Sequence, residues 1–372
     1  MALKRIKLGE LIELSDKTNS DLLFSLDDVK GISIQKKFIE TKADMLGVSL
    51  KPYLLVEPDS FAYVTVTSRN GEKITIAHNT TDKTYIVSSS YVVFRVKNND
   101  ILDSNYLFMF FNRPEFDRYS RFNSWGSARE VFSWDDMCDV DIDLPDIETQ
   151  RKYVKVYLNM VENQQILESG ISDLKTVCNG KIEKIRETTV SKSIFPYLTE
   201  RTETNKNGEV FLMKGVGLKG FIEPNQVRSA ESLKKCNIFY KNDFVYAPSS
   251  IKNGVISFND KYEKAICTEE YIVFSINDTK KLNPYYLLMW LKRDELGRYI
   301  DFLSIDSVRN RFYFKDLEII EIPIPDIDTQ NRIASVYKTY IDRNEINNNL
   351  KELINELCPI LIKGSIEEAK RS

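Results

Sequence analysis

The sequence has very little of the residue types from which catalytic and metal sites are most often built. Among its 372 residues there is one histidine, His78. A metal site with two imidazole ligands is therefore excluded, and a Ser-His-Asp or Cys-His mechanism would depend on one residue in an expected polar loop. The five cysteines are odd in number and never spaced as pairs, so we expect reduced thiols rather than disulfides or a zinc cage. They are Cys138, Cys178, Cys236, Cys267 and Cys358.

Long apolar runs and an excess of positive charge are also missing. Stretches such as Tyr106 to Phe111 are far shorter than the roughly 20 apolar residues that span a membrane, and no signal peptide is recognisable. We therefore expect no membrane contact and a cytoplasmic location. The net charge is −3 and the pI about 5.6, so the chain as a whole has no basic footprint of a nucleic-acid binder. A local basic face would still be enough to contact phosphates.

The sequence contains an internal repeat of one unit in two copies. Asp143 to Gln150 reads DLPDIETQ and Pro323 to Gln330 reads PIPDIDTQ, 180 residues apart. The same offset, without a gap, relates Tyr91 to Tyr271, and the match continues from there through both copies. Two copies are too few for a solenoid, so the repeat predicts two similar lobes, each followed by a long helix. Further identical pairs are Tyr106 and Tyr286, Arg113 and Arg293, Glu115 and Glu295, Arg118 and Arg298, Tyr119 and Tyr299, Phe122 and Phe302, and Arg129 and Arg309.

Each lobe is predicted to be of the α+β class, with short strands first and a helix late. The late helix is expected from Tyr106 to Phe116, with its copy from Tyr286 to Leu296. Turn residues at Asn70-Gly71 and Asn253-Gly254 indicate a hairpin in each lobe. Expected strands in the first lobe are Tyr53 to Val56, Phe61 to Val66, Ile74 to Ala77, Tyr85 to Val87 and Tyr91 to Val96. The predicted divisions are 1–145, a first lobe; 146–187, a central helix; 188–325, a second lobe; and 326–372, a C-terminal helix.

Both long helices show a seven-residue apolar repeat. Pro-Asp-Ile begins each one, with an acid near the positive end of the helix dipole. Apolar residues then recur at seven, with polar residues near the middle of each run, and this pattern predicts an antiparallel coiled coil. The tracks include Val154, Val161, Ile171, Cys178 and Ile185 in the first helix, and Ile333, Tyr340, Ile354 and Leu361 in the second.

Two motifs resemble catalytic loops but lack the necessary context. Gly215, Gly217 and Gly220 form a GxGxxG pattern, yet the following residues do not begin a helix as a nucleotide loop requires. The stretch from Asn283 to Tyr286 is similar to the Asn-Pro-Pro-Tyr loop of amino-group DNA methyltransferases, with Tyr285 in place of the second proline. Proline at an early helical position is better explained as a helix entry. An acid-and-lysine pattern at Asp146, Asp173 and Lys175 lies along one straight helix and cannot converge on one Mg²⁺.

The best recognition candidate is the segment from Asn123 to Arg129. It combines glycine, small hydroxyls and arginine with Trp125, a mixture suited to stacking and hydrogen bonding on a ligand. The corresponding segment, Ser304 to Arg311, has the same framework with other residues between. Identical frameworks with different loops indicate two lobes that do one job on two different targets. The alternative is an ordinary loop whose Trp125 packs into the core, and the sequence leaves both open.

Two lobes, each ending in the motif PDIETQ or PDIDTQ that opens a coiled-coil helix, resemble the specificity subunits of type I restriction–modification systems. The stretch from Glu115 to Glu130 also looks like the target-recognition domains of that family. The resemblance implies two DNA-reading domains held apart by paired helices, with one half of a split DNA sequence for each. It implies no catalysis and no cofactor in this chain. Double-stranded DNA, two modification subunits and restriction subunits are the implied partners, with S-adenosylmethionine, ATP and Mg²⁺ bound by those subunits.

Three readings remain at this point: the specificity subunit, an enzyme (a DNA methyltransferase or nuclease with degenerate motifs), and a coiled-coil scaffold that does not bind DNA. For the first reading we expect each hairpin loop and its Ser-x-Arg segment to form one DNA-binding surface. Arginine suits guanine, asparagine suits adenine, and serine suits base edges or phosphates. The expected DNA-binding residues are Ser68, Arg69, Asn70, Ser124, Trp125, Ser127 and Arg129 in the first lobe, and Ser249, Ser250, Lys252, Asn253, Ser304, Ser307, Arg309, Asn310 and Arg311 in the second.

Overall fold

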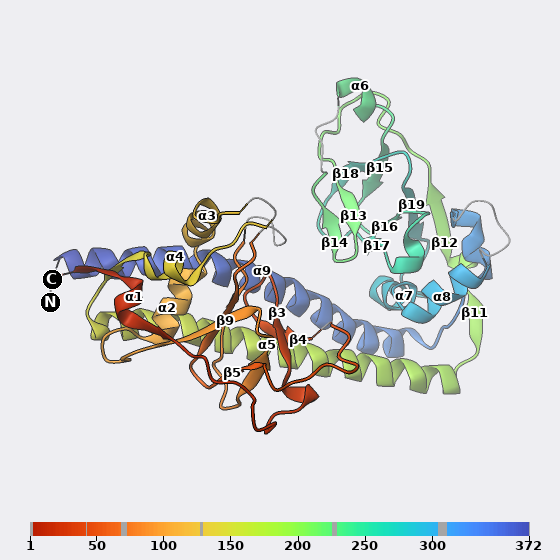
Figure 1. Ribbon diagram of the computed structural model, residues 1–372. Coiled ribbons are helices and arrows are strands. Elements are labelled where there is room, and N and C mark those ends of the chain that lie inside the picture. The colour runs from red at the N-terminus through yellow and green to blue at the C-terminus, as the bar shows by residue number, and fades with distance from the viewer. Residues whose placement is uncertain are drawn as a thin grey trace. The chain divides into compact units, whose positions relative to one another are not determined.

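The computed structural model describes residues 3–41, 43–67, 73–126, 129–224, 229–303 and 311–371 (Figure 1). The chain forms two compact units. One consists of Met1–Gln165 with Asn349–Ser372, and the other of Ile166–Asn348. Each unit therefore contains one lobe and one part of each long helix.

The first lobe is built around an antiparallel sheet with the strand order β2-β9-β6-β7. Three two-stranded pairs, β1-β10, β3-β4 and β5-β8, complete it. The strands are β1 (Lys4–Lys7), β2 (Ile12–Leu14), β3 (Lys30–Ile32), β4 (Phe38–Glu40), β5 (Leu54–Val56), β6 (Phe61–Val64), β7 (Ile76–His78), β8 (Tyr85–Val87), β9 (Tyr91–Val96) and β10 (Asp141–Leu144). The helices are α1 (Leu8–Leu11), η1 (Leu26–Asp28), α2 (Ser104–Phe111), α3 (Pro114–Phe122), α4 (Trp134–Cys138) and the long α5 (Ile147–Thr188).

The second lobe repeats this topology strand for strand. Its four-stranded sheet has the order β12-β19-β16-β17, and its pairs are β11-β20, β13-β14 and β15-β18. The strands are β11 (Ser191–Ser193), β12 (Leu198–Arg201), β13 (Gly215–Gly217), β14 (Gly220–Ile222), β15 (Asn237–Tyr240), β16 (Asp243–Tyr246), β17 (Ile256–Phe258), β18 (Lys264–Cys267), β19 (Ile272–Ile276) and β20 (Glu321–Pro323). The helices are η2 (Phe195–Tyr197), α6 (Ala230–Leu233), η3 (Ile251–Asn253), α7 (Pro284–Leu291), α8 (Asp294–Leu303), η4 (Phe314–Ile319) and the long α9 (Ile327–Arg371).

The two cores repeat even the geometry of their aromatic rings. Phe61 and Phe94 stack with centroids 5.0 Å apart, and their counterparts Phe244 and Phe274 stack at 4.9 Å. These residues face one another across paired strands, where aromatic pairs contribute beyond their buried area. The duplication predicted from the sequence and the α+β class are confirmed.

The late helix is the clearest error of the sequence reading. Instead of one helix from Tyr106 to Phe116, each lobe has two short helices, α2 then α3 and α7 then α8. Asn112 ends α2, and Pro114 starts α3 at a position where the missing N–H is not needed. The single histidine is also placed differently, because His78 lies in β7 and not in a polar loop. Its Nε2 is 2.9 Å from an Asp59 oxygen, and its ring stacks on Phe61.

The motif Pro-Asp-Ile-x-Thr-Gln fastens each long helix to its lobe. Asp146 caps α5 by accepting hydrogen bonds from the N–H and hydroxyl of Thr149, and these bonds lower the pKa of its carboxyl group. Gln150 is fully buried. Its Nε2 donates to the carbonyls of Ile101 and Pro145 at 2.9 and 2.8 Å, and its Oε1 accepts from the Asp103 N–H at 3.0 Å.

The second copy makes the same set of bonds. Gln330 is also fully buried. It donates to the carbonyls of Lys281 and Pro325 and accepts from the Asn283 N–H at 2.9 Å. Asn283 in turn caps α7, with Pro284 at its start, so the methyltransferase-like stretch is a helix entry. The glutamine side chain thus replaces water for three backbone groups that the helix and lobe bury together.

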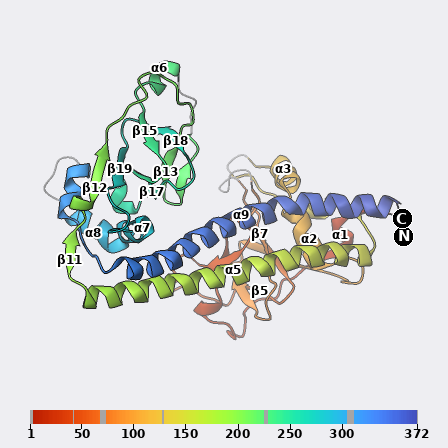
Figure 2. The same cartoon turned by 180° about the vertical axis from the view of Figure 1, so that it is seen from behind.

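The long helices lie side by side and antiparallel (Figures 1 and 2). In the first unit Lys152 of α5 binds Glu368 of α9 at 2.8 Å, and Val154 shares an apolar cluster with Leu361. In the second unit Cys178 and Tyr337 belong to one cluster. Side chains along the predicted track through Ile171, Cys178 and Ile185 are buried, as are Ile333, Ile354 and Leu361. The seven-residue pattern therefore marked the packed seam.

Gln150→Leu should lower the free energy of unfolding by about 2–4 kcal/mol, because three buried backbone groups lose their partners. Gln165→Leu is the matched control, since Gln165 is exposed on the same helix. Chemical denaturation of both variants measures the difference. Equal stability of the two would show that the buried amide does not anchor α5.

Ile354→Asp should cost on the order of 2–5 kcal/mol, because it places an unpaired carboxylate in the seam. Ile360, six residues further along α9, is 63% exposed and supplies the control Ile360→Asp. Thermal melting of both variants tests the seam. If Ile354→Asp melted at the same temperature as Ile360→Asp, the assigned packing face of α9 would be wrong.

Candidate nucleic-acid interface

In the first lobe the hairpin β6-β7 and the loop after α3 run side by side. The Phe132 N–H donates to the Thr65 carbonyl at 2.9 Å, and the Thr67 N–H donates to the Glu130 carbonyl at 3.0 Å. Val66 and Val131 form an antiparallel bridge between the two segments. The base of the hairpin loop and the base of the Ser-x-Arg segment are therefore joined.

Trp125 does not pack into the core. Its backbone pairs with Val131 in both directions, at 3.1 and 2.9 Å, which fixes the position of the loop. Its side chain is 67% exposed. Of the two interpretations left open by the sequence, the exposed aromatic is the one observed. Gly126 next to it has φ +141, and an added Cβ would lie 2.1 Å from the Arg129 carbonyl, so the turn requires glycine.

A buried ion pair supports the other side of this hairpin. The Lys36 ammonium lies 2.8 Å from an Asp117 oxygen on α3, and the same oxygen accepts the Ile74 N–H at 3.2 Å. Ile74 belongs to the strand side of the hairpin, directly after its loop. Burial lowers the pKa of Lys36, and Asp117 opposes that shift. α3 therefore packs against the hairpin β6-β7 and supports it from this side.

The second lobe supports its hairpin at the corresponding place, with glycine at the position of Asp117. The Phe312 N–H donates to the Pro248 carbonyl at 3.0 Å, the counterpart of the bond between Phe132 and Thr65. Gly297 occupies the position equivalent to Asp117, and a Cβ there would lie 2.1 Å from the Lys252 carbonyl. The turn η3 can therefore rest directly on the backbone of α8. Lys252 also binds Asp301 of that helix at 2.6 Å.

The expected DNA-binding residues differ in their exposure to solvent. Trp125, Arg129, Ser249, Asn253 and Arg311 are exposed, and Ser250 and Lys252 are half-buried. Ser124 is buried, and its hydroxyl donates to the Ser120 carbonyl at 2.6 Å. The remaining expected residues lie outside the described part of the chain: Ser68, Arg69, Asn70, Ser127, Ser304, Ser307, Arg309 and Asn310.

Lys36, Asp117 and Gly297 were missed by the sequence reading. The sequence signal for this position was a difference between the two copies of the repeat. Residues Arg113 to Phe122 match Arg293 to Phe302 at many positions, but Gly297 stands where the first copy has Asp117. Only the contacts show that this position faces the hairpin in each lobe.

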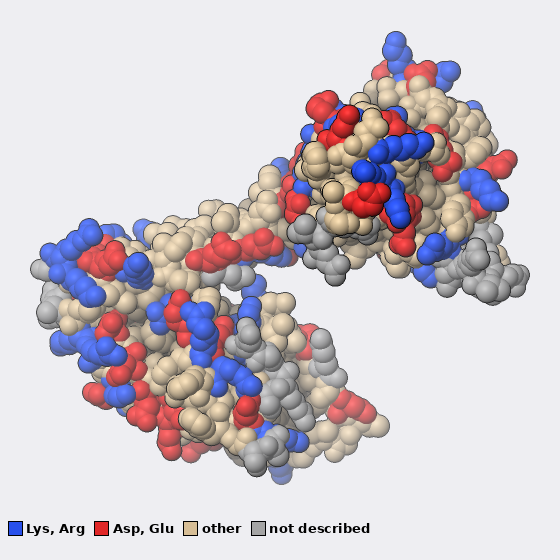
Figure 3. All heavy atoms as spheres, turned by 90° about the horizontal axis from the view of Figure 1, so that it is seen from above, with Lys and Arg blue, Asp and Glu red and all other residues tan. Residues whose placement is uncertain are grey.

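Charges are mixed on the face shown in Figure 3, where Lys and Arg side chains lie among Asp and Glu. Among the described residues on that face, the Lys and Arg side chains form no continuous basic surface. Among the described residues, no group of three His, Cys, Asp or Glu side chains is placed to hold a metal ion. Nor does any helix in these ranges have the length and apolarity needed to cross a membrane.

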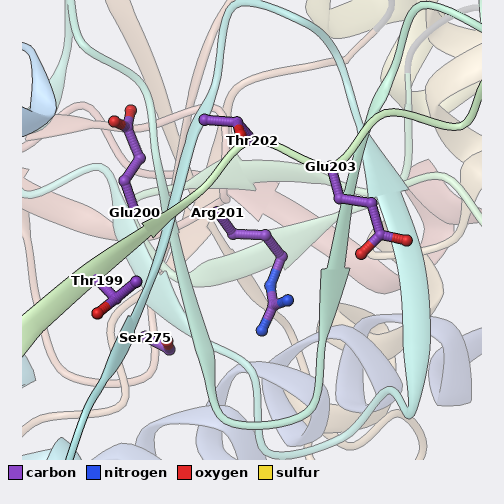
Figure 4. Close-up of a pocket in the computed structure, with 6 residues that line it drawn as sticks. All are labelled: Thr199, Glu200, Arg201, Thr202, Glu203 and Ser275. Carbon is purple, nitrogen blue, oxygen red and sulfur yellow. The ribbon is translucent and has the colours of Figure 1, made fainter.

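A hollow lies along the edge strand β12 of the second lobe (Figure 4). Its guanidinium, Arg201, is held by both oxygens of Asp243 at 2.7 and 3.1 Å. Burial raises the pKa of the neighbouring Glu200. The GxGxxG pattern is also structural, because Gly215 and Gly217 lie in β13 and Gly220 opens β14 after a two-residue turn.

A family model for the type I restriction modification DNA specificity domain matches residues 4–176 and again residues 168–356. The chain belongs to this family. It is a DNA specificity subunit of a type I restriction–modification system with two target-recognition domains, and subunits of this family provide specificity rather than catalysis. The two matches correspond to the two copies of the repeat.

A solved structure of a specificity subunit has a similar fold. The S subunit of a type I restriction-modification system from M. genitalium has a TM-score of 0.63 at 11% sequence identity, over 98% of this chain and 96% of that one. The HsdS subunit from Thermoanaerobacter tengcongensis has a TM-score of 0.37 at 14% identity, over 100% of this chain and 97% of that one. No curated protein matches the sequence.

Gly297→Ala should lower the free energy of unfolding by about 1–3 kcal/mol, because the new methyl group would overlap the Lys252 carbonyl and displace η3. Gly180→Ala is the control, since nothing lies within 4 Å of a Cβ at that helical position. The control should gain up to about 1 kcal/mol from helix propensity. Chemical denaturation gives both values, and a Gly297→Ala variant as stable as Gly180→Ala would exclude the close contact.

Proposed function

We propose that each lobe reads one half of a bipartite DNA target through the surface formed by its hairpin loop and the segment after α3 or α8. The joined bases of these loops support the proposal, since the bond from Phe132 to Thr65 recurs as the bond from Phe312 to Pro248. The framework is thus the same in both lobes, while the residues it presents differ. Such an arrangement suits two readers with different half-sites.

The chemistry of the exposed residues fits base readout. Arg129 and Arg311 are long, exposed cations suited to guanine or phosphate, and Asn253 is an exposed amide suited to adenine. Trp125 offers a flat, exposed aromatic face. We leave Ser124 out of the contact surface because its hydroxyl is buried. Arg309 stays in the proposal on the strength of the repeat alone.

The proposed partners are double-stranded DNA, two modification subunits and restriction subunits. S-adenosylmethionine, ATP and Mg²⁺ would be bound by those subunits, and the complex would work in the cytoplasm. The paired helices α5 and α9 would serve as spacer and docking surface. The predicted divisions at 145, 187 and 325 would then separate reading parts from spacer parts.

Arg129→Ala should weaken or relax readout of one half-site by about 1–3 kcal/mol, and Arg309→Ala should do so for the other half. Arg95→Ala is the control, because Arg95 is exposed on β9 and paired with Glu13. Filter-binding titrations against duplexes altered in one half at a time give the energies. The assignment fails if both variants bind like the control, or if each variant affects both halves equally.

A further inference from the structure

One arginine of the repeat has acid partners in the second lobe and none in the first. Arg113 and Arg293 occupy the same position, directly before α3 and α8. The Arg293 Nη2 atom lies 2.9 Å from a Glu183 oxygen on α5, and its Nε atom lies 3.0 Å from Glu295. The Arg113 Nε atom donates instead to the Phe110 carbonyl at 3.1 Å, and the guanidinium lies over that ring, 3.9 Å from its centroid. Among the described residues, no carboxylate forms an ion pair with Arg113.

The difference comes from a change of charge on the long helix that packs against each lobe. The offset of 180 residues relates Cys178 of α5 to Cys358 of α9, and each is buried against its own lobe. In the same register Lys363 stands where α5 has Glu183. The helix beside Arg113 therefore carries a cation at the position from which the second lobe receives its acid.

The two guanidinium groups differ accordingly in their electrostatic surroundings. Burial lowers the pKa of Arg113, and the nearby charge of Glu115 opposes this shift only in part. Burial acts on Arg293 as well, but hydrogen bonds to Glu295 and Glu183 outweigh it and raise the pKa. A carboxylate placed at Arg113 would supply the interaction that the second lobe already contains.

A hollow of about 350 Å³ opens at Arg113 within the first unit, between the start of α3 and the C-terminal part of α9. Its volume is in the range of small-molecule sites. The charged residues that line it are Arg113, Lys363 and Lys370, together with Glu115 and Glu367. Lys363 and Glu367 form a loose pair at 3.9 Å. Positive charges exceed negative ones by a single charge, so one carboxylate neutralises the hollow better than a dianionic phosphate does.

The hollow also has an apolar side. Pro359 and Ile366 of α9 line it, whereas α5 has Asn179 and Arg186 at the equivalent positions. Ile366 packs against the core of the first lobe, which fixes its position. This side suits a short hydrocarbon chain next to the charged groups.

We propose that this hollow binds a carboxylate group carried on a short apolar chain. The carboxylate lies against the Arg113 guanidinium, whose planar donors match its two oxygens, and the chain lies along Pro359 and Ile366. The bound group takes the place that Glu183 holds beside Arg293 in the second unit. Small organic acids and the glutamate side chains of peptides share this chemistry.

Butyrate and N-acetylglutamate amide are the probes, the first for a free acid and the second for a glutamate side chain in a peptide. Butyramide is the uncharged control, and inorganic phosphate is the anion without a chain. Methyl NMR of the full chain labelled at isoleucine follows the Ile366 signal during each titration. Ile366→Val assigns that signal.

Two variants change the charge of the hollow in opposite ways. Arg113→Gln removes the guanidinium, and Lys363→Glu supplies the acid that the second copy carries. Arg293→Gln is the matched control at the equivalent position of the other lobe. We expect butyrate to shift the Ile366 signal saturably in the parent and the control, and to bind at least about tenfold more weakly to the other two variants, as for loss of a charged hydrogen bond. Lys363→Glu should melt no lower than the parent, which separates loss of binding from loss of folding.

The proposal fails if butyrate gives no saturable shift in the parent, or if butyramide shifts the signal as butyrate does. Equal binding by the parent and Lys363→Glu would also overturn it. Phosphate binding tighter than butyrate would make the hollow a general anion site and contradict the carboxylate. Tighter binding of N-acetylglutamate amide than of butyrate assigns the site to an acidic side chain, and the reverse order assigns it to a free acid.

Discussion

A buried glutamine side chain at the start of each long helix is the interaction on which the rest of the structure depends. Gln150 and Gln330 each join three backbone groups: one from their own helix entry and two from the turn before α2 or α7. Without such a side chain these groups would be buried without partners. The far end of each helix is held as well, because Tyr106 bonds Ser365 in the first unit and Arg293 binds Glu183 in the second. Each lobe is therefore tied to both helices.

This framework separates what is common to the lobes from what distinguishes them. Strand order, the stacked rings and the glutamine anchors are the same in both copies. The position at Asp117 and Gly297 differs, and it contacts the hairpin β6-β7 in the first lobe and the hairpin β16-β17 in the second. In the first lobe the buried salt bridge between Lys36 and Asp117 supports the hairpin. In the second lobe the absence of a side chain at Gly297 lets η3 approach α8 closely, and Lys252 binds Asp301 there. Corresponding helices can therefore carry loops of different shape. One duplicated unit can thus present two different surfaces.

The sequence was sufficient for the repeat, the α+β class and the packed faces of the long helices, because each has a periodic or duplicated signal. It failed at Asn112 to Pro114, where the apolar run from Tyr106 ends, Asn112 caps one helix and Pro114 begins another. His78 was misplaced because polar neighbours hide a short buried strand. For the candidate site, the sequence pointed to Trp125 and Arg129, which are exposed, and to Ser124, which is buried with its hydroxyl donating to the Ser120 carbonyl. The salt bridge between Lys36 and Asp117 joins residues that are 81 positions apart, and no local sequence pattern predicts it.

The central claim is that each lobe recognises its own DNA half-site independently, although both lobes have the same framework. The most direct test is a chain whose second lobe, 188–325, is replaced by the equivalent residues of the first, expressed with its partner subunits. Methylation mapping then identifies the modified sequence. We predict two copies of the half-site that the first lobe reads in the parent. Retention of the parental sequence, with its second half unchanged, would contradict the account.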